Sequence, residues 1–190
     1  MGVNAPHGQD WVMVGDGELA PDVLTRWATR PECGAVVTFC GTARNSSGVD
    51  HVIQALEYDT SVELAEERVR QVIALARKRW PMLGAVAIHH RVGEVQLEES
   101  AVVIVVSSPH RAAAYEASQF CIDTVKKCVP MWKREIWEGG SAWSEEAQDL
   151  LRVADLDVGD LDVGDPDVAD LDVADLGVAP GDVGDEGDRR

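Results

Sequence analysis

Hydrophobic and polar positions alternate in two periods along residues 11–150, and these periods predict an ordered series of strands and helices. Residues 102–106 are continuously apolar and β-branched, which is typical of a buried strand. Apolar positions recur every three or four residues over 62–80 and 112–128, which predicts two amphipathic helices. The remaining patterns predict strands at 11–14, 34–40, 51–58, 85–91 and 131–137 and a short helix at 21–29. We therefore expect an α+β fold, with a mixed or antiparallel sheet and two main helices packed on it.

The start of the first long helix carries a capping signal. Thr60 stands where an N-cap residue is expected, and Glu63 follows three residues later. This spacing predicts a capping box, in which the hydroxyl and the carboxylate bind the free N–H groups of the first turn.

Two basic residues open the second long helix, where the physics of a helix disfavours them. Pro109 ends the buried strand, so His110 and Arg111 fall in the first turn. Unpaired N–H groups and the helix dipole favour an anion at that end, not a cation. Cations placed there indicate an anionic ligand that the helix end and the side chains share.

Two lysines further along have both a structural and a functional interpretation. Lys126 lies in the last turn of the same helix, where a lysine normally complements the dipole. Lys133 lies in the strand predicted at 131–137, on the same face as Glu135, where it could be a cross-strand charge partner. Only together with His110 and Arg111 do these lysines suggest a site.

Five motifs in a fixed order make the sequence recognisable. They are Gly-Ala-Val-Val-Thr-Phe-Cys-Gly-Thr-Ala-Arg-Asn at 34–45, Leu-Glu-Tyr at 56–58, His-Arg-Val-Gly-Glu at 90–94, Ser-Pro-His-Arg at 108–111 and Pro-Met-Trp-Lys-Arg-Glu at 130–135. In this set the chain resembles the family of the large, catalytic subunit of molybdopterin synthase. The resemblance spans residues 12–146, and several spaced motifs are more specific than one alone.

The resemblance implies an activity, a fold and partners. Members of the family are sulfurtransferases of molybdenum cofactor biosynthesis with an α/β-hammerhead-like fold. They take sulfur from the C-terminal thiocarboxylate of a small ubiquitin-like carrier subunit and convert cyclic pyranopterin monophosphate (precursor Z) into molybdopterin. They work as a dimer of large subunits with two carriers, and the step requires no metal or other cofactor. A non-catalytic scaffold that keeps the fold and binds anions is the alternative.

The resemblance also assigns roles to the basic residues of this sequence. Lys126 matches the lysine beside the carrier's terminal carbonyl, and Lys133 matches a second catalytic lysine that also contacts substrate. Arg44, His110 and Arg111 match the group that binds the substrate phosphate. Relatives often add an arginine near the C-terminus that reaches the neighbouring subunit. Here no Arg or Lys occurs between Arg134 and Arg152, so Arg152 is the candidate substitute.

Charge is distributed unevenly, which divides the chain into a predicted flexible start at 1–10, a domain at 11–150 and an acidic tail at 151–190. The formal net charge is −17, of which residues 151–190 contribute −10 and residues 1–150 contribute −7. This balance argues against nucleic-acid binding, so anion binding must come from a local cluster of cations. The tail repeats an Ala/Gly-Asp-Leu-Asp-Val unit without aromatic residues, which predicts disorder. Short pentapeptide-repeat stacking is the alternative.

Cysteine usage and hydropathy point to a cytoplasmic protein without a metal centre. The four cysteines lack C-x-x-C spacing, and Cys121 and Cys128 are expected to be small core residues. Cys40 lies four residues before Arg44, near the expected pocket. No apolar run approaches the ~20 residues that a membrane span requires, and the first residues do not resemble a secretion signal.

Overall fold

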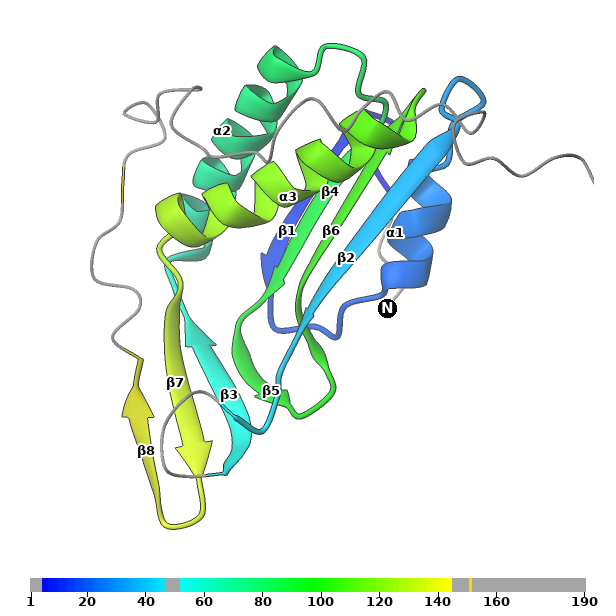
Figure 1. The fold of residues 1–190 in the computed structure, drawn as a ribbon. Helices are drawn as coiled ribbons and strands as arrows, with labels where there is room; N and C mark the ends of the chain where they lie inside the picture. Colours follow the sequence, from blue (N-terminus) through cyan, green and yellow to red (C-terminus); the bar gives the residue numbers. More distant parts are fainter. Residues whose placement is uncertain (1–4, 47–51, 145–150, 152–190) are drawn as a thin grey trace, which may run out of the picture.

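Two four-stranded sheets and three helices make up the computed structural model, which describes residues 5–46, 52–144 and 151 (Figure 1). The first sheet, called the core sheet here, has the order β1-β4-β6-β2. Its strands are β1 (Asp10–Gly15), β4 (Val86–Arg91), β6 (Ser100–Ser108) and β2 (Ala35–Thr42). The second sheet is antiparallel, in the order β5 (Gly93–Gln96), β3 (Ile53–Asp59), β7 (Trp132–Trp137) and β8 (Gly140–Trp143). The helices are α1 (Pro21–Ala28), α2 (Val62–Arg79) and α3 (Arg111–Cys128).

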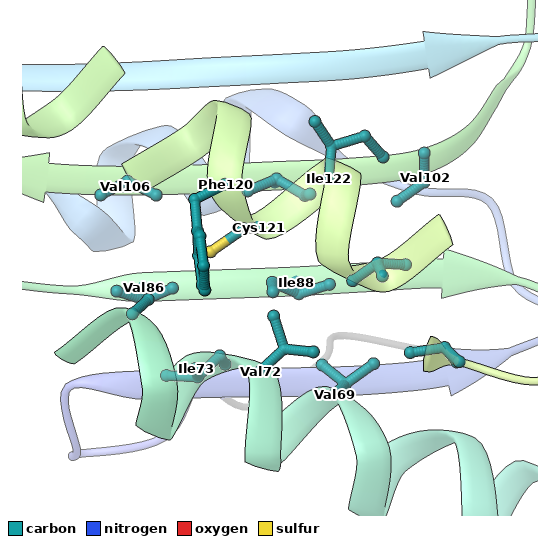
Figure 2. Packing of buried hydrophobic residues seen from close by; sticks show 14 of the residues in the cluster. Val69, Val72, Ile73, Val86, Ile88, Val102, Val106, Phe120, Cys121 and Ile122 are labelled. Atoms are coloured by element: carbon teal, nitrogen blue, oxygen red, sulfur yellow. The ribbon is translucent and has the colours of Figure 1, made fainter. Parts of the chain in front are cut away.

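The core sheet is mixed, and helices cover both of its faces. β1 runs parallel to β4, whereas β6 is antiparallel to both β4 and β2. Ile104 of β6 and Ile88 of β4 face α2 and α3, and all of these pack into one cluster that includes Phe120 (Figure 2). Val103 and Val105 point the other way, into a cluster with α1. Because both faces are buried, β6 is apolar without alternation, as the run at 102–106 predicts.

The chain crosses from the core sheet into the second sheet directly after β4. Val92 separates β4 from β5, and Gly93 takes a positive φ of 78°, a conformation that other residues rarely adopt. The register of β2 also shifts between Gly41 and Thr42, next to the segment that leads to β3. The second sheet consequently continues from one end of the core sheet, below the C-terminal end of α3 (Figure 1).

Most of the predicted elements are confirmed, and the predicted α+β class is correct. Two details are wrong. The sequence pattern implied one sheet, whereas the structure has two. Strands β5 and β8, which complete the second sheet, were not predicted. The expected capping box does not form, since α2 begins after Ser61 without a side-chain cap. The hydroxyl of Thr60 instead donates to the carbonyl oxygen of Pro130.

Other expectations concern the ends of the chain and the cysteines. The repeat at 152–190 and residues 1–4 lie outside the described residues. Cys121 and Cys128 are buried in the core with free thiols, and burial raises the pKa of Cys121 to about 12. Among the described helices, none is both long and apolar enough to cross a membrane.

Candidate functional site

A cavity of about 660 Å³ opens where the two sheets meet the C-terminal end of α3. It is formed by segments far apart in the sequence: the ends of β2 and β4, the start of β6, the last turns of α3, and strands β3 and β7. Its walls mix apolar and ionisable side chains: Phe39, Gly41, Thr42, Arg44, Ser46, Leu56, Tyr58, His90, Ala101, Val102, Ile122, Val125, Lys126, Val129, Met131, Lys133, Glu135 and Ser144.

Three of the five predicted site residues line this one cavity. Lys126 reaches it from the last turn of α3, Lys133 from β7, and Arg44 from the segment after β2. Arg44 and Lys126 are exposed, whereas Lys133 is half-buried. Three cations around one concave space lower the electrostatic cost of bringing anions together there.

A buried carboxylate holds one of these cations. Glu135 is 8% exposed, and its Oε1 lies 3.5 Å from the Nζ of Lys133. Both side chains project from the same face of β7, as the strand period predicts. The next residue, Arg134, points to the opposite face and pairs with Glu57 of β3 at 2.5 Å. Lys133 therefore has a charged partner on its own strand, two residues away.

The other two predicted residues lie at the far end of α3. His110 is the N-cap residue and Arg111 the first helical residue, and both side chains are exposed. Fifteen residues separate Arg111 from Lys126, which at the helical rise is roughly 22 Å. The expected convergence of all five residues therefore does not occur within one copy of the chain.

The N-terminal end of α3 nevertheless keeps the features that suggested an anion there. Among the three described helices, α1 and α2 have an acidic residue in the first turn, whereas α3 has none. Its first-turn N–H groups receive no side-chain cap. The start of β2 packs tightly against this turn, since a Cβ on Gly34 would lie 2.8 Å from the carbonyl oxygen of Pro109.

Sequence reasoning missed two residues of the cavity wall, Tyr58 and His90. Their rings meet edge to face, with centroids 5.1 Å apart. His90 lies near the end of β4, in the His-Arg-Val-Gly-Glu motif at 90–94. The available signal was strand alternation, which places His90 on the same face of β4 as Ile88.

Cys40, which was expected near the pocket, and the motif residue Trp132 are not part of the cavity wall. Cys40 is exposed, and the alternation of β2 turns it away from the wall that its neighbours Phe39 and Gly41 form. Trp132 is also exposed, on the face of β7 opposite Lys133. In the part of the chain that the structure describes, no cluster of three or more His, Cys, Asp or Glu side chains is arranged to hold a metal ion.

Comparison with known proteins places the chain in a family. The profile of the MoaE protein family matches residues 14–128. A molybdopterin synthase catalytic subunit from Taeniopygia guttata is 38% identical over 140 residues, which cover 74% of this chain and 90% of the relative. A second such subunit, from Thermoplasma volcanium, is 44% identical over 132 residues, covering 69% of this chain and 94% of the relative.

Solved structures agree with the sequence comparison. The crystal structure of molybdopterin synthase from Staphylococcus aureus matches with a TM-score of 0.65 and 36% identity, covering 69% of this chain and 94% of that one. The chain belongs to the MoaE family of molybdopterin synthase catalytic subunits, as its motifs predicted. Because these relatives are enzymes of molybdenum cofactor biosynthesis, a non-catalytic scaffold is not favoured.

Proposed function

We propose that this chain transfers sulfur from the thiocarboxylate of a small carrier protein to cyclic pyranopterin monophosphate, forming molybdopterin. One observation supports the proposal most directly: Arg44, Lys126 and Lys133 come from three separate segments and line the same cavity. A thiocarboxylate and a phosphate repel each other, so a site that joins them needs fixed positive charge in a partly dry space.

Each cation has a distinct task in this reaction. Lys126 neutralises the carrier's terminal group and stabilises the tetrahedral intermediate from which sulfur departs. Lys133, oriented by Glu135 at 3.5 Å, contacts the pterin substrate and takes part in proton transfer. Arg44 binds the phosphate, for which its planar guanidinium is suited.

A second copy of the chain supplies the remaining phosphate ligands. His110 and Arg111 lie roughly 22 Å along α3 from Lys126, too far to reach the same ligand in one copy. Both side chains are exposed at a helix end that lacks an acidic residue. In a dimer, this end of α3 in one copy completes the cavity of the other. Arg152, the basic residue of the tail nearest the domain, is a further candidate for this contribution.

The carrier subunit occupies the open side of the cavity. Its terminal Gly-Gly segment is narrow enough to enter between α3 and the second sheet and to place sulfur beside Lys126. The cavity lies where β7, β3 and the end of α3 meet, so a carrier docked over the second sheet can reach it.

Five finer predictions accompany this proposal. The fold is of the α/β-hammerhead type, the chemistry needs no cofactor, and the protein works in the cytoplasm. The domain ends near residue 150, and the acidic repeat at 151–190 takes no part in sulfur transfer.

Reconstitution tests the activity. The purified chain is mixed with thiocarboxylated carrier and precursor Z, and molybdopterin is detected as product. We expect product with the native chain. Absence of product with a carrier that binds would overturn the proposed function.

A mixed dimer tests the shared cavity. A chain carrying Arg111→Ala and a chain carrying Lys126→Ala are each nearly inactive alone. Copurified as a heterodimer with two different tags, they regenerate one intact cavity and recover about half of the native activity, since one of the two sites is restored. No recovery would show that each cavity belongs to a single copy.

A further inference from the structure

His90 differs from the adjacent histidine in what its ring faces. His89 points toward α1, where its ring meets Trp11 edge to face at 5.0 Å and its Nε2 is buried without a partner. His90 points to the other face of β4 and lines the cavity. It is 7% exposed, and the cavity is the space that this small exposed surface faces.

The tautomer of His90 follows from one hydrogen bond. Its Nδ1 lies 2.8 Å from the carbonyl oxygen of Arg91. A carbonyl oxygen can only accept, so Nδ1 carries the hydrogen and Nε2 carries the lone pair. The edge-to-face contact with Tyr58 fixes the plane of the ring. Within the described ranges, no side chain or backbone group donates to Nε2, which leaves the lone pair for a ligand.

His90 is in the protonation state that a hydrogen-bond acceptor requires. Burial lowers its pKa to about 4, and the bond to the Arg91 carbonyl only partly offsets this. The imidazole therefore stays neutral near pH 7. Around it, Arg44, Lys126 and Lys133 can only donate hydrogen bonds, and Glu135 is already paired with Lys133.

This combination selects a particular ligand chemistry. A fully ionised anion such as sulfate satisfies the cations but brings no hydrogen for Nε2, and its oxygens are repelled by the lone pair. A pterin carries N–H donors on its ring system as well as the phosphate of its side ring. It can therefore satisfy both kinds of group at once.

We infer that His90 is a specificity-determining residue, whose Nε2 accepts a hydrogen bond from an N–H or O–H group of the pterin and orients it in the cavity. The inference rests on the proposed function, since it assigns a pterin to that site.

Two variants distinguish the effect of the Nε2 acceptor from the effect of losing the rest of the imidazole ring. His90→Asn keeps an N–H near the position of Nδ1, so the bond to Arg91 is retained, but it lacks an acceptor at Nε2. His90→Gln is the matched control, because its longer side chain places an amide oxygen near the position of Nε2. Thermal unfolding of both variants checks that the fold is intact.

Binding is measured by calorimetry on the full chain in complex with a carrier that ends in an ordinary carboxylate, so that no turnover occurs. The two ligands are precursor Z and inorganic sulfate, which carries no hydrogen at neutral pH. We expect His90→Asn to weaken precursor Z binding by about 3- to 10-fold, the value of one neutral hydrogen bond, and to leave sulfate binding within about twofold. His90→Gln should restore most of the loss.

Two results would overturn the inference while leaving the proposed function intact. One is native affinity of the folded His90→Asn variant for precursor Z. The other is an equal loss for both ligands, which would indicate a general change in the cavity. If the native chain neither binds precursor Z nor forms molybdopterin, the proposed function fails and the inference fails with it.

Discussion

The two sheets differ in how much apolar side chain they bury. We expect the core sheet to contribute most to folding stability and the second sheet to contribute to the proposed site. The core sheet lies between helices, and its central strand β6 is buried over 101–108. The second sheet has a smaller apolar cluster, centred on Ile53, Leu56 and Val95. Its strand β7 has one exposed and one buried residue, Trp132 and Glu135, with the others partly buried, and it carries charged residues on both faces.

The second sheet also holds two ion pairs. Lys133 pairs with Glu135, and Arg134 pairs with Glu57, all within the second sheet. The ion pairs of the core sheet lie at strand ends, where Asp10 of β1 pairs with Arg77 and Arg91 of β4 pairs with Glu99. The comparison teaches that the core sheet positions the second sheet and the end of α3, whereas the cavity between them supplies the reactive groups.

The largest expected effect is on stability and tests the contrast directly. Ile104→Ala removes a fully buried side chain from the centre of β6 and should lower the free energy of unfolding by about 2–5 kcal/mol. Ile136→Ala, in β7, is the matched control and should cost less than about 1.5 kcal/mol, because Ile136 is only partly buried. Urea unfolding measures both. Equal costs would remove the distinction between the sheets.

Lys126→Ala should have the opposite effect: it should greatly reduce molybdopterin formation and leave the free energy of unfolding nearly unchanged. We expect molybdopterin formation to fall by about 100-fold or more, because the charge that stabilises the intermediate is lost. The side chain is exposed, so the free energy of unfolding should change by less than about 0.5 kcal/mol, and the carrier should still bind. Lys127→Ala is the control, since Lys127 is exposed in the same turn and does not line the cavity. Native turnover by the Lys126 variant would contradict the assigned role.

The adjacent histidines of β4, His89 and His90, predict a loss of folding stability in mild acid. Burial lowers the pKa of both His89 and His90 from 6.5 to about 4. Between these values the unfolded chain binds protons that the folded chain does not, so stability falls as the pH drops below 6.5 toward 4. Each histidine should contribute about 2 kcal/mol of loss between pH 7 and pH 5.

Urea unfolding at the two pH values, with the native chain and His90→Gln, isolates this contribution. The variant should lose about 2 kcal/mol less than the native chain over the same interval. An unchanged pH dependence would show that His90 is not held in the neutral form.

The smallest effect concerns the acidic repeat. Removal of residues 152–190 keeps Leu151, whose N–H donates to the carbonyl oxygen of Lys127 at 3.0 Å. Turnover in the reconstituted assay should stay within a few-fold of the native value, because the cavity is built from residues of the domain. A collapse of activity would assign the repeat, or Arg152 within it, to the catalytic assembly.

Much of the core sheet could be predicted because its signals are local. The apolar run at 102–106 and the helical stripe of α2 both depend on neighbouring residues, and Ala65, Val69, Val72, Ile73 and Ala76 are all buried. The second sheet was predicted only in part. Its strands β3 and β7 followed from local pattern, whereas β5 and β8 have four residues each and carry weak patterns. The capping box failed because Pro130, seventy residues away, takes the hydroxyl of Thr60.

The site was only partly predictable. Motif order identified the basic residues, and the positions of Lys126 on α3 and Lys133 on β7 followed from local pattern. What the pattern could not supply was distance. It placed Arg111 and Lys126 on one helix but treated them as neighbours, although the rise of a helix separates them. His90 was missed because a sequence does not show where the apolar interior ends and a cavity begins.

In the proposed dimer, the length of α3 sets the spacing between the residues at its two ends. In the proposed function, α3 carries phosphate ligands at one end and the sulfur-transfer lysine at the other, so its eighteen residues set the distance between two reaction centres. Inserting or deleting one residue within it would displace a ligand from both centres at once, whereas a point substitution at either end disables one function and leaves the spacing unaltered.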